Sequence, residues 1–483
     1  MQKAILKSNR FSLPITWILL FGLVIRVLFI LKGGSVYYGK EDFWLMGGDT
    51  HGWMNSFLNL LNHGVYTSNP DIENAKFFRP PGYSFAMGIV YLLCGKDLAI
   101  TYKALIWLQT FFDIITIYLI YKIAIITTKN KLISYISAFL YATYPFVIVW
   151  VPILYAESFS LFFMIAGLYF FIKSGSEWKY FWAAFLTGLA ALCRLQCLPL
   201  LPVMLLVILI SRENWNVQLK RAFLFSIGIL LGYGLWPIRN YINHDRFVLT
   251  EDVDIGGHWS HDYFALMDFL FATQVDVEPQ WSQILTDQEV SWPSNLNLDS
   301  SEKNLLDSLT VLLKQCGTGV SYFRYYSGLN YDTILPGRNC DSAIEAGFKL
   351  LTANQKEKNK FNHYIKVPAG NVKKAFFKSA LYGNKSPSVK MIAIGIFGYR
   401  TLLLFVGIAG LYFAWRKKLM QQDLLFIILF YFLGWYGFMC IAFRHLEIRY
   451  FLHADLLLLF PAACLIGNLL NSSSVIRQKN SRT

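Results

Sequence analysis

The sequence FSLPITWILLFGLVIRVLFIL, residues 11–31, is the first of several long apolar runs in the chain. An apolar helix of about twenty residues is long enough to cross the hydrocarbon core of a bilayer. No A-x-A type cleavage site follows the run, so we interpret it as a retained span and not as a signal peptide. Of the 483 residues, 55% are hydrophobic and only 15% are charged. These features predict an all-α polytopic membrane protein.

The other apolar segments give the expected number of spans. The segment at about 83–94 is too short to cross a bilayer alone, so we interpret it as a half-span or re-entrant piece. That leaves seven spans before a large hydrophilic region and three after it, and the alternative of eleven full spans stays open. The segments lie at about 83–94, 98–121, 132–150, 153–172, 180–193, 197–211, 221–238, 391–414, 423–441 and 450–470.

Basic residues predict the orientation of these spans. Lys3, Lys7 and Arg10 precede the first apolar run, and other Lys and Arg residues gather in short loops and in the tail 471–483. Cytoplasmic loops of membrane proteins carry such an excess of positive charge. We therefore expect the chain to lie in the inner membrane, with both termini in the cytoplasm. The same distribution explains the net charge of +14 without nucleic acid, for which no binding module is recognisable.

This orientation divides the chain into four parts. Residues 1–238 form a transmembrane module with a first extracytoplasmic loop at 32–82, and residues 239–390 form a large extracytoplasmic region. Residues 391–470 add three C-terminal transmembrane helices, and residues 471–483 form a basic cytoplasmic tail. We expect membrane lipids around the apolar parts.

Two segments of these loops have helical periodicity. Trp53, Phe57, Leu60 and Leu61 recur at helical spacing, which predicts a short helix lying in the membrane interface. The run Asn304 to Leu313 in the large region is amphipathic and also predicts a helix.

The seven cysteines show no metal-type spacing. Cys316 and Cys340 both lie in the large polar region, where a disulfide can form if that region is extracytoplasmic. Cys193 and Cys197 lie beside an apolar segment, which favours packed thiols.

Asp49, in Gly47-Gly48-Asp49, is the first candidate for chemistry. A carboxylate just beyond a span lies at the interface, where it can accept a proton from a hydroxyl. One reaction that suits such a carboxylate is glycosyl transfer from a lipid phosphate. Its phosphate leaving group needs little acid assistance, so one carboxylate is sufficient for an inverting displacement at the sugar carbon. The alternative interpretation is that Asp49 caps a helix that begins near Gly52.

Arg79 begins the second motif, Arg79-Pro80-Pro81-Gly82-Tyr83. The two prolines restrict the backbone and keep Arg79 away from helical geometry. A guanidinium held in this way suits a phosphate clamp, and Tyr83 is a further candidate ligand for the same phosphate. The alternatives are an arginine that extends to lipid headgroups and a tyrosine that anchors the interface.

Other polar residues lie where later spans reach the same face. Glu157 opens an apolar run, where an ionisable group marks a functional site or a partner for its own helix dipole. Arg194 lies between two apolar segments and can pair with Glu157 or hold phosphate. The remaining candidates are the neighbours Arg239 and Asn240 and the neighbours Arg449 and Tyr450.

Nothing in the sequence requires a metal or an organic cofactor. It contains no Walker loop, no HExxH and no GxGxxG or GxSxG motif in a suitable context. His51 and His63 lie near Asp49 and leave a divalent metal possible, although two histidines and one aspartate in a loop are weak support. We therefore expect no required cofactor.

In this order, the motifs resemble those of the GT-C superfamily of membrane glycosyltransferases, most closely the protein-mannosyltransferase and aminoarabinose-transferase branch. The resemblance rests on Gly48-Asp49, on Arg79 to Tyr83, on Glu157 and on Ala-Leu-Cys-Arg at 191–194. It continues with Trp-Pro-Ile-Arg-Asn-Tyr at 236–241 and Glu-Ile-Arg-Tyr at 447–450. It covers most of the chain outside about 255–390. One departure is Gly-Gly-Asp-Thr-His, where many relatives have an Asp-Glu pair.

The resemblance implies a role for each matched residue. Asp49 is implied to be the catalytic carboxylate, and Glu157 stands where that branch has a second acidic residue. Arg79 occupies a position that contacts the lipid phosphate in aminoarabinose transferases, and Arg239 is implied as a further phosphate ligand.

The leading hypothesis is an inverting glycosyltransferase that moves a hexose or pentose from a polyprenyl-phosphate donor to an acceptor hydroxyl at the outer face. The acceptor can be a lipid, a glycan or a protein. A transporter or flippase of a lipid-linked saccharide is the alternative from another class, although no repeat of the kind common in transporters is visible. A glycan ligase or polymerase is the third interpretation.

Overall fold

The computed structural model describes residues 13–45, 48–252, 259–327, 329, 338–377 and 387–480. Every regular element within these ranges is a helix, as the apolar runs predict. Lys3, Lys7, Arg10, Gly47 and the end of the basic tail, 481–483, lie outside the described residues.

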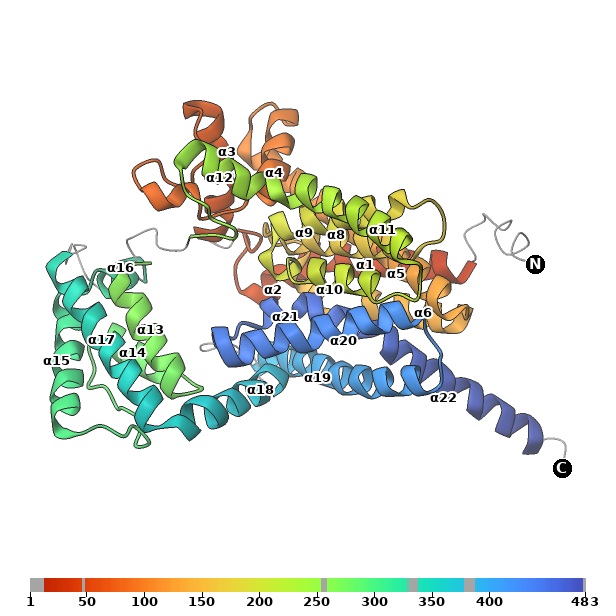
Figure 1. Ribbon diagram of the computed structural model, residues 1–483. Coiled ribbons are helices and arrows are strands. Elements are labelled where there is room, and N and C mark those ends of the chain that lie inside the picture. The colour runs from red at the N-terminus through yellow and green to blue at the C-terminus, as the bar shows by residue number, and fades with distance from the viewer. Residues whose placement is uncertain are drawn as a thin grey trace.

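The first half of the chain forms most of a helical body (Figure 1). The initial helix runs from Leu13 through a π-turn to Tyr38, so it continues beyond the predicted boundary at residue 31. The helices that the first half contributes to this body are α1 (Leu13–Leu28), α2 (Gly34–Tyr38), α5 (Leu98–Thr128), α6 (Lys131–Ala142), α7 (Pro145–Trp150), α8 (Glu157–Ile172), α9 (Trp178–Cys193), α10 (Leu200–Leu209), α11 (Trp215–Ile229) and α12 (Leu235–His244).

The C-terminal helices complete this body. They are α19 (Pro387–Arg416), α20 (Gln422–Gly437), α21 (Ile448–Leu457) and α22 (Leu459–Asn480), and they lie against the first-half helices in Figure 1. Contacts between α22 and α6 and between α20 and α10 join the two halves.

Five helices of the described chain are long and apolar enough to cross a membrane, or six if the bent pair α21 and α22 counts as one span. This confirms a polytopic all-α protein, but the predicted ten to eleven spans are not confirmed. Helices α6, α8 and α10 are apolar but shorter. The predicted half-span is α4 (Pro81–Leu93), which is also a short apolar helix.

Two buried ion pairs lie inside the helical body, and the sequence analysis did not anticipate them. Arg26 Nε lies 2.5 Å from Asp113 Oδ2, and Tyr141 donates to the other carboxylate oxygen at 2.6 Å. Arg400 Nε pairs with Asp455 at 2.7 Å in the same manner. A charge in an apolar interior is costly without a partner, so each pair fixes the two helices that supply it.

The polar region between the two halves folds as a separate lobe, which we name the loop bundle (Figure 1). Its own apolar core includes Leu266, Phe269, Leu309 and Phe348. The predicted amphipathic run is part of α15, which begins with a capping box at Asp299. The bundle consists of α13 (His261–Thr273), α14 (Glu278–Leu285), α15 (Ser300–Cys316), α16 (Thr318–Tyr326) and α17 (Arg338–Lys358). The next helix, α18 (Val367–Phe377), leads from the bundle to α19 and packs against the helical body (Figure 1).

The cysteines behave as predicted. Cys316 and Cys340 form a disulfide that joins the end of α15 to the start of α17. Cys193 and Cys197 are free and buried.

The first loop packs on the end of the helical body that carries the candidate site. Its predicted interface helix is α3 (Gly48–His63), and α3 packs against α4 and lies near α12 in Figure 1. A Cβ added to Gly82 at the start of α4 would lie 2.7 Å from the backbone of Leu192 in α9. This close approach brings the Arg79 turn next to the end of α9, which Arg194 follows.

Candidate active site

Asp49 lies in the first turn of α3, where two arginines from distant parts of the chain bind its carboxylate. Arg79 Nη2 donates to Oδ1 at 2.5 Å, and Arg449 Nη1 donates to Oδ2 at 3.2 Å. The alternative of a cap for a helix starting near Gly52 is wrong, because α3 already begins at Gly48. The structure thus brings together three of the predicted site residues.

Burial and the neighbouring arginines have opposite effects on the pKa of Asp49. Burial raises the pKa, whereas the charges of Arg79, Arg449 and Arg194 lower it, and the net result is a pKa of about 2. Asp49 is therefore ionised at neutral pH. While both arginines hold it, it is a weak base, because efficient proton acceptors have a pKa near the working pH.

Arg79 is held tightly and is not an arginine that extends to lipid headgroups. Its side chain is only 13% exposed, and its guanidinium lies 4.7 Å from the ring centre of Trp53 and 4.2 Å from that of Phe78. The hydroxyl of Tyr66 donates to the Arg79 carbonyl at 2.9 Å. Pro81 opens α4 at a position where its missing N–H costs nothing.

Arg194 lies over the same tryptophan and forms an ion pair with Glu157. This pair is one of the two partners expected for Arg194 from the sequence. Its guanidinium lies 5.1 Å from the ring centre of Trp53 and 5.8 Å from that of Tyr155. Glu157 is the first residue of α8, so it also faces the positive end of its own helix.

Two N–H donors of these arginines are unused. Arg79 Nε and Arg194 Nε are buried and have no hydrogen-bond partner among the described residues. A buried donor without a partner is costly, and anions bind well to guanidinium groups. Two cations with spare donors therefore lie against the ring of Trp53, which is an arrangement suited to an anion such as phosphate.

Glu447 is a further site residue, which the sequence motifs alone did not indicate. Its carboxylate accepts from Arg449 Nε at 2.5 Å and from the Tyr450 hydroxyl at 3.2 Å, and it lies 3.5 Å from His445. Arg449 is thus held between Asp49 and Glu447. The signal available in the sequence was its spacing of two residues from Arg449.

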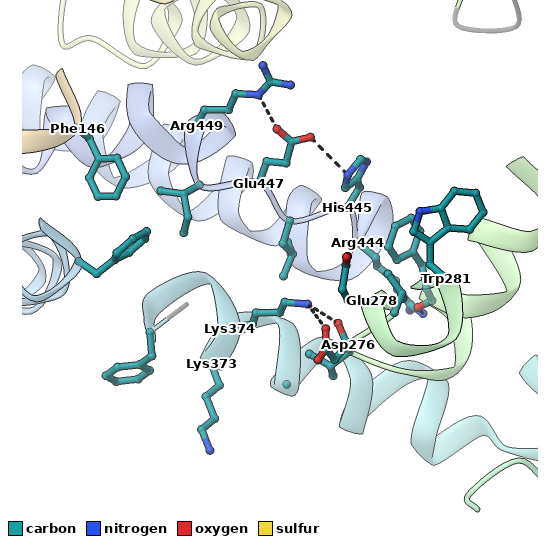
Figure 2. A pocket seen from close by; sticks show the side chains of 18 of the residues that line it. Phe146, Asp276, Glu278, Trp281, Lys373, Lys374, Arg444, His445, Glu447 and Arg449 are labelled. Atoms are coloured by element: carbon teal, nitrogen blue, oxygen red, sulfur yellow. Dashed lines mark hydrogen bonds and ion pairs between the residues drawn. The ribbon is translucent and has the colours of Figure 1, made fainter. Parts of the chain in front are cut away.

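A cavity of about 1280 Å³ adjoins Arg449 between the helical body and the loop bundle. Figure 2 shows Glu447 and Arg449 on one side and the ion pair of Lys374 with Asp276 on the other. The cavity wall is aromatic and carries both basic and acidic side chains. Its lining includes Tyr37, Tyr38, Trp150, Tyr155, Tyr263, Phe271, Trp281, Lys373, Lys374 and Arg444.

Several predicted residues are engaged elsewhere in the structure. Tyr83 is fully buried and donates to Gln109 at 2.6 Å. Arg239 donates to the carbonyls of Tyr66 and Lys76 at 3.0 and 3.1 Å, so it supports the first loop. Asn240 next to it donates to the Val248 carbonyl at 3.0 Å.

The histidines near Asp49 do not gather around it. His51 and His63 are both exposed. Across the described ranges, no three His, Cys, Asp or Glu side chains are grouped in a way that could hold a metal ion.

Comparisons with known proteins agree with the resemblance. Residues 78–235 match the family model described as dolichyl-phosphate-mannose-protein mannosyltransferase, which confirms the resemblance to GT-C membrane glycosyltransferases over that segment. No curated protein matches the chain at a significant level.

Two solved structures of a protein named ArnT from Cupriavidus metallidurans are also similar. One is described as bound to undecaprenyl phosphate, and it is 14% identical with a TM-score of 0.40 over 96% of this chain and 80% of that one. The apo form is 14% identical with a TM-score of 0.39 over 94% and 78%.

Proposed function

We propose that this chain, whose residues 78–235 match a membrane glycosyltransferase family, moves a sugar from a polyprenyl-phosphate donor to an acceptor hydroxyl. One observation carries the proposal: Asp49 is held by Arg79 and Arg449, and the spare donors of Arg79 and Arg194 lie over Trp53. The carboxylate and the phosphate site then share the guanidinium of Arg79.

The donor phosphate binds at these arginines. A lipid-linked sugar phosphate is a diester with one negative charge, and it takes the free N–H groups of Arg79 and Arg194 first. The description of the matched family, with a dolichyl phosphate as its carrier, supports a polyprenyl phosphate here. An apolar groove of about 370 Å³ beside Val36, Pro145 and Ile396 gives part of a lipid chain a place to lie.

Phosphate binding prepares Asp49 for proton transfer. Phosphate competes for the guanidinium of Arg79, so the Asp49 carboxylate loses a hydrogen-bond partner and its pKa rises from about 2. Asp49 becomes a better base only when a donor is present. Without a bound donor, Asp49 stays ion-paired with Arg79 and is a weak base.

The reaction is a single displacement at the anomeric carbon. The acceptor oxygen forms a bond to this carbon while its proton goes to Asp49, and the bond from carbon to the phosphate oxygen breaks with its electron pair on the phosphate. The products are the glycosylated acceptor and a polyprenyl phosphate monoester with a second negative charge. Arg79 and Arg194 stabilise that developing charge, which lowers the barrier.

The cavity beside Arg449 receives the acceptor. The loop bundle supplies Tyr263 and Trp281 to its wall, and α18 supplies Lys374, so these residues select which hydroxyl reaches Asp49. Glu157 orients Arg194 through their ion pair. Lys and Arg gather in short loops and in the tail, and loops with such charge usually face the cytoplasm. This distribution supports cytoplasmic termini and a site on the outer side of the inner membrane.

The test is transfer of radiolabelled sugar from polyprenyl-phosphate donors by the purified protein in lipid nanodiscs. Wild type releases label from the donor, whereas Asp49→Asn and Arg79→Ala do not. Asp71→Asn and Arg246→Ala are matched controls, because both residues are exposed and make the same charge changes near the first loop. The controls are expected to keep full activity.

Three outcomes would overturn the proposal. A fully active Asp49→Asn protein removes the base. Donor-dependent thermal stabilisation of wild type without turnover of any donor favours the transporter. Turnover only of diphosphate-linked glycans favours a ligase or polymerase.

A further inference from the structure

Glu251 lies on a short strap, residues 248–252, that is fastened over the Arg79 turn. Trp236 Nε1 donates to the Thr250 carbonyl at 2.7 Å, and the Asp252 N–H donates to the Phe77 carbonyl at 3.1 Å. These bonds lie on either side of Glu251 in the sequence. The strap therefore holds Glu251 in place relative to Phe78 and Arg79.

The carboxyl group of Glu251 belongs electrostatically to the candidate site. Burial raises its pKa, Arg79 and Arg194 lower it, and Asp49 raises it further. The net effect is a raised pKa. The same three residues thus act on Glu251 and on one another, although Glu251 comes from a different part of the chain.

Glu251 differs from the other site carboxylates because it has no partner. Asp49 is bound by two arginines, Glu157 by Arg194, and Glu447 by Arg449. No hydrogen bond or ion pair of the Glu251 side chain occurs within the part of the chain that the structure describes. A half-buried carboxyl group that lies on this strap and lacks a partner has its hydrogen-bonding capacity available for a ligand.

We propose that Glu251 binds hydroxyl groups of the sugar that is being transferred. The inference rests on the proposed function, because it takes the donor phosphate to lie at Arg79 and Arg194. A sugar joined to that phosphate through one oxygen lies within one ring of the phosphate. The bond from the Asp252 N–H to the Phe77 carbonyl holds Glu251 beside the Arg79 turn, so this ring is the group within its reach.

A carboxylate suits this role chemically. Its two oxygens accept hydrogen bonds from two neighbouring hydroxyls of a pyranose or furanose ring, and a buried bond of this kind to a charged group is strong. A base must reach the acceptor hydroxyl. Asp49 is hydrogen-bonded to Arg449, which lines the acceptor cavity, whereas Glu251 neither lines that cavity nor, among the described residues, bonds to a residue that does. We therefore assign Glu251 to donor recognition and leave proton transfer with Asp49.

Binding measurements on the full-length protein in nanodiscs test this assignment. The ligands are bare undecaprenyl phosphate and undecaprenyl phosphate carrying glucose, galactose, mannose or arabinose. Glu251→Gln is expected to weaken binding of the preferred sugar-bearing lipid about ten- to hundredfold. It is expected to bind the bare lipid as well as wild type or better, because a negative charge near Arg79 is removed.

Asp252→Asn is the matched control, since Asp252 lies on the same strap and pairs with the exposed Arg246. It is expected to change neither affinity. A deoxy-sugar donor that lacks the contacted hydroxyl is expected to bind wild type weakly and Glu251→Gln equally weakly.

Two results would overturn the inference. Equal binding of every sugar-bearing lipid by wild type and Glu251→Gln rules out a sugar contact. Equal weakening of bare and sugar-bearing lipids assigns Glu251 to the phosphate site. The comparison does not depend on turnover, so failure of the proposed transfer reaction and failure of this inference are separate results.

Discussion

Replacing Asp49 with Asn should abolish transfer and yet tighten the binding of undecaprenyl phosphate. In the free protein, Asp49 occupies the guanidinium of Arg79 at 2.5 Å and that of Arg449 at 3.2 Å. A phosphate at Arg79 and Arg194 must displace this carboxylate before it can use the whole guanidinium of Arg79. An asparagine is neutral and competes much less, so the variant offers the arginines to the ligand in advance.

The lowered pKa of Asp49 gives the size of the effect. Its pKa is about 2, compared with an ordinary value of 3.8, and its side chain is 25% exposed. A difference of about two pKa units corresponds to roughly 2.5 kcal/mol, or about sixtyfold in affinity. Asparagine still accepts one weaker hydrogen bond. We therefore expect Asp49→Asn to bind the lipid about ten- to sixtyfold more tightly at low ionic strength.

The assay is a titration of nanodisc-embedded protein with undecaprenyl phosphate, followed by microscale thermophoresis at neutral pH. Asp71→Asn makes the same charge change on the exposed surface of the first loop and should leave the affinity unchanged. Equal or weaker binding by Asp49→Asn, at an unchanged melting temperature, would refute competition between Asp49 and phosphate for the guanidinium of Arg79.

Three further predictions concern the shape of the site and the loop bundle. Arg79→Lys should lose about a hundredfold in kcat/KM, because an ammonium lacks the planar fork, and steady-state kinetics that match wild type would contradict this. Gly82→Ala should lower the melting temperature and the rate of transfer, since its Cβ would lie 2.7 Å from the backbone of α9; an unchanged melting curve would contradict this. Cys316→Ser with Cys340→Ser should destabilise the loop bundle by roughly 3 kcal/mol through the 24-residue separation. Faster limited proteolysis would show this, and reducing agent should accelerate proteolysis of wild type but not of the double variant.

The sequence was sufficient for the type of fold but not for the path of each helix. The apolar run at 132–150 predicted one span, whereas the structure has α6 ending at Ala142 and α7 beginning at Pro145. Hydrophobicity measures the total length of apolar chain and does not distinguish a straight helix from a broken one. The loop bundle was beyond prediction as a unit because its core forms between segments far apart in sequence.

The sequence predicted the site residues that lie where apolar segments end, because these residues are expected to meet at the same face of the membrane. Asp49, Arg79 and Arg449 lie at the ends of apolar segments, and the structure brings them together. Tyr83 lies at a similar depth but faces Gln109, because sequence position does not reveal the direction in which a side chain points. Glu251 was missed because an acidic residue in a polar loop is ordinary by sequence.

The ion pair of Arg26 with Asp113 has a consequence for biogenesis. The two residues are 87 positions apart, and Arg26 lies in the middle of the first apolar helix with its side chain fully buried. When this helix emerges from the ribosome, its partner has not yet been synthesised, and an unpaired arginine at the centre of a bilayer is costly. We therefore expect the first helix to stay beside the insertion machinery until α5 has been synthesised. Crosslinking of stalled nascent chains would detect that delay, and Arg26→Leu should shorten it.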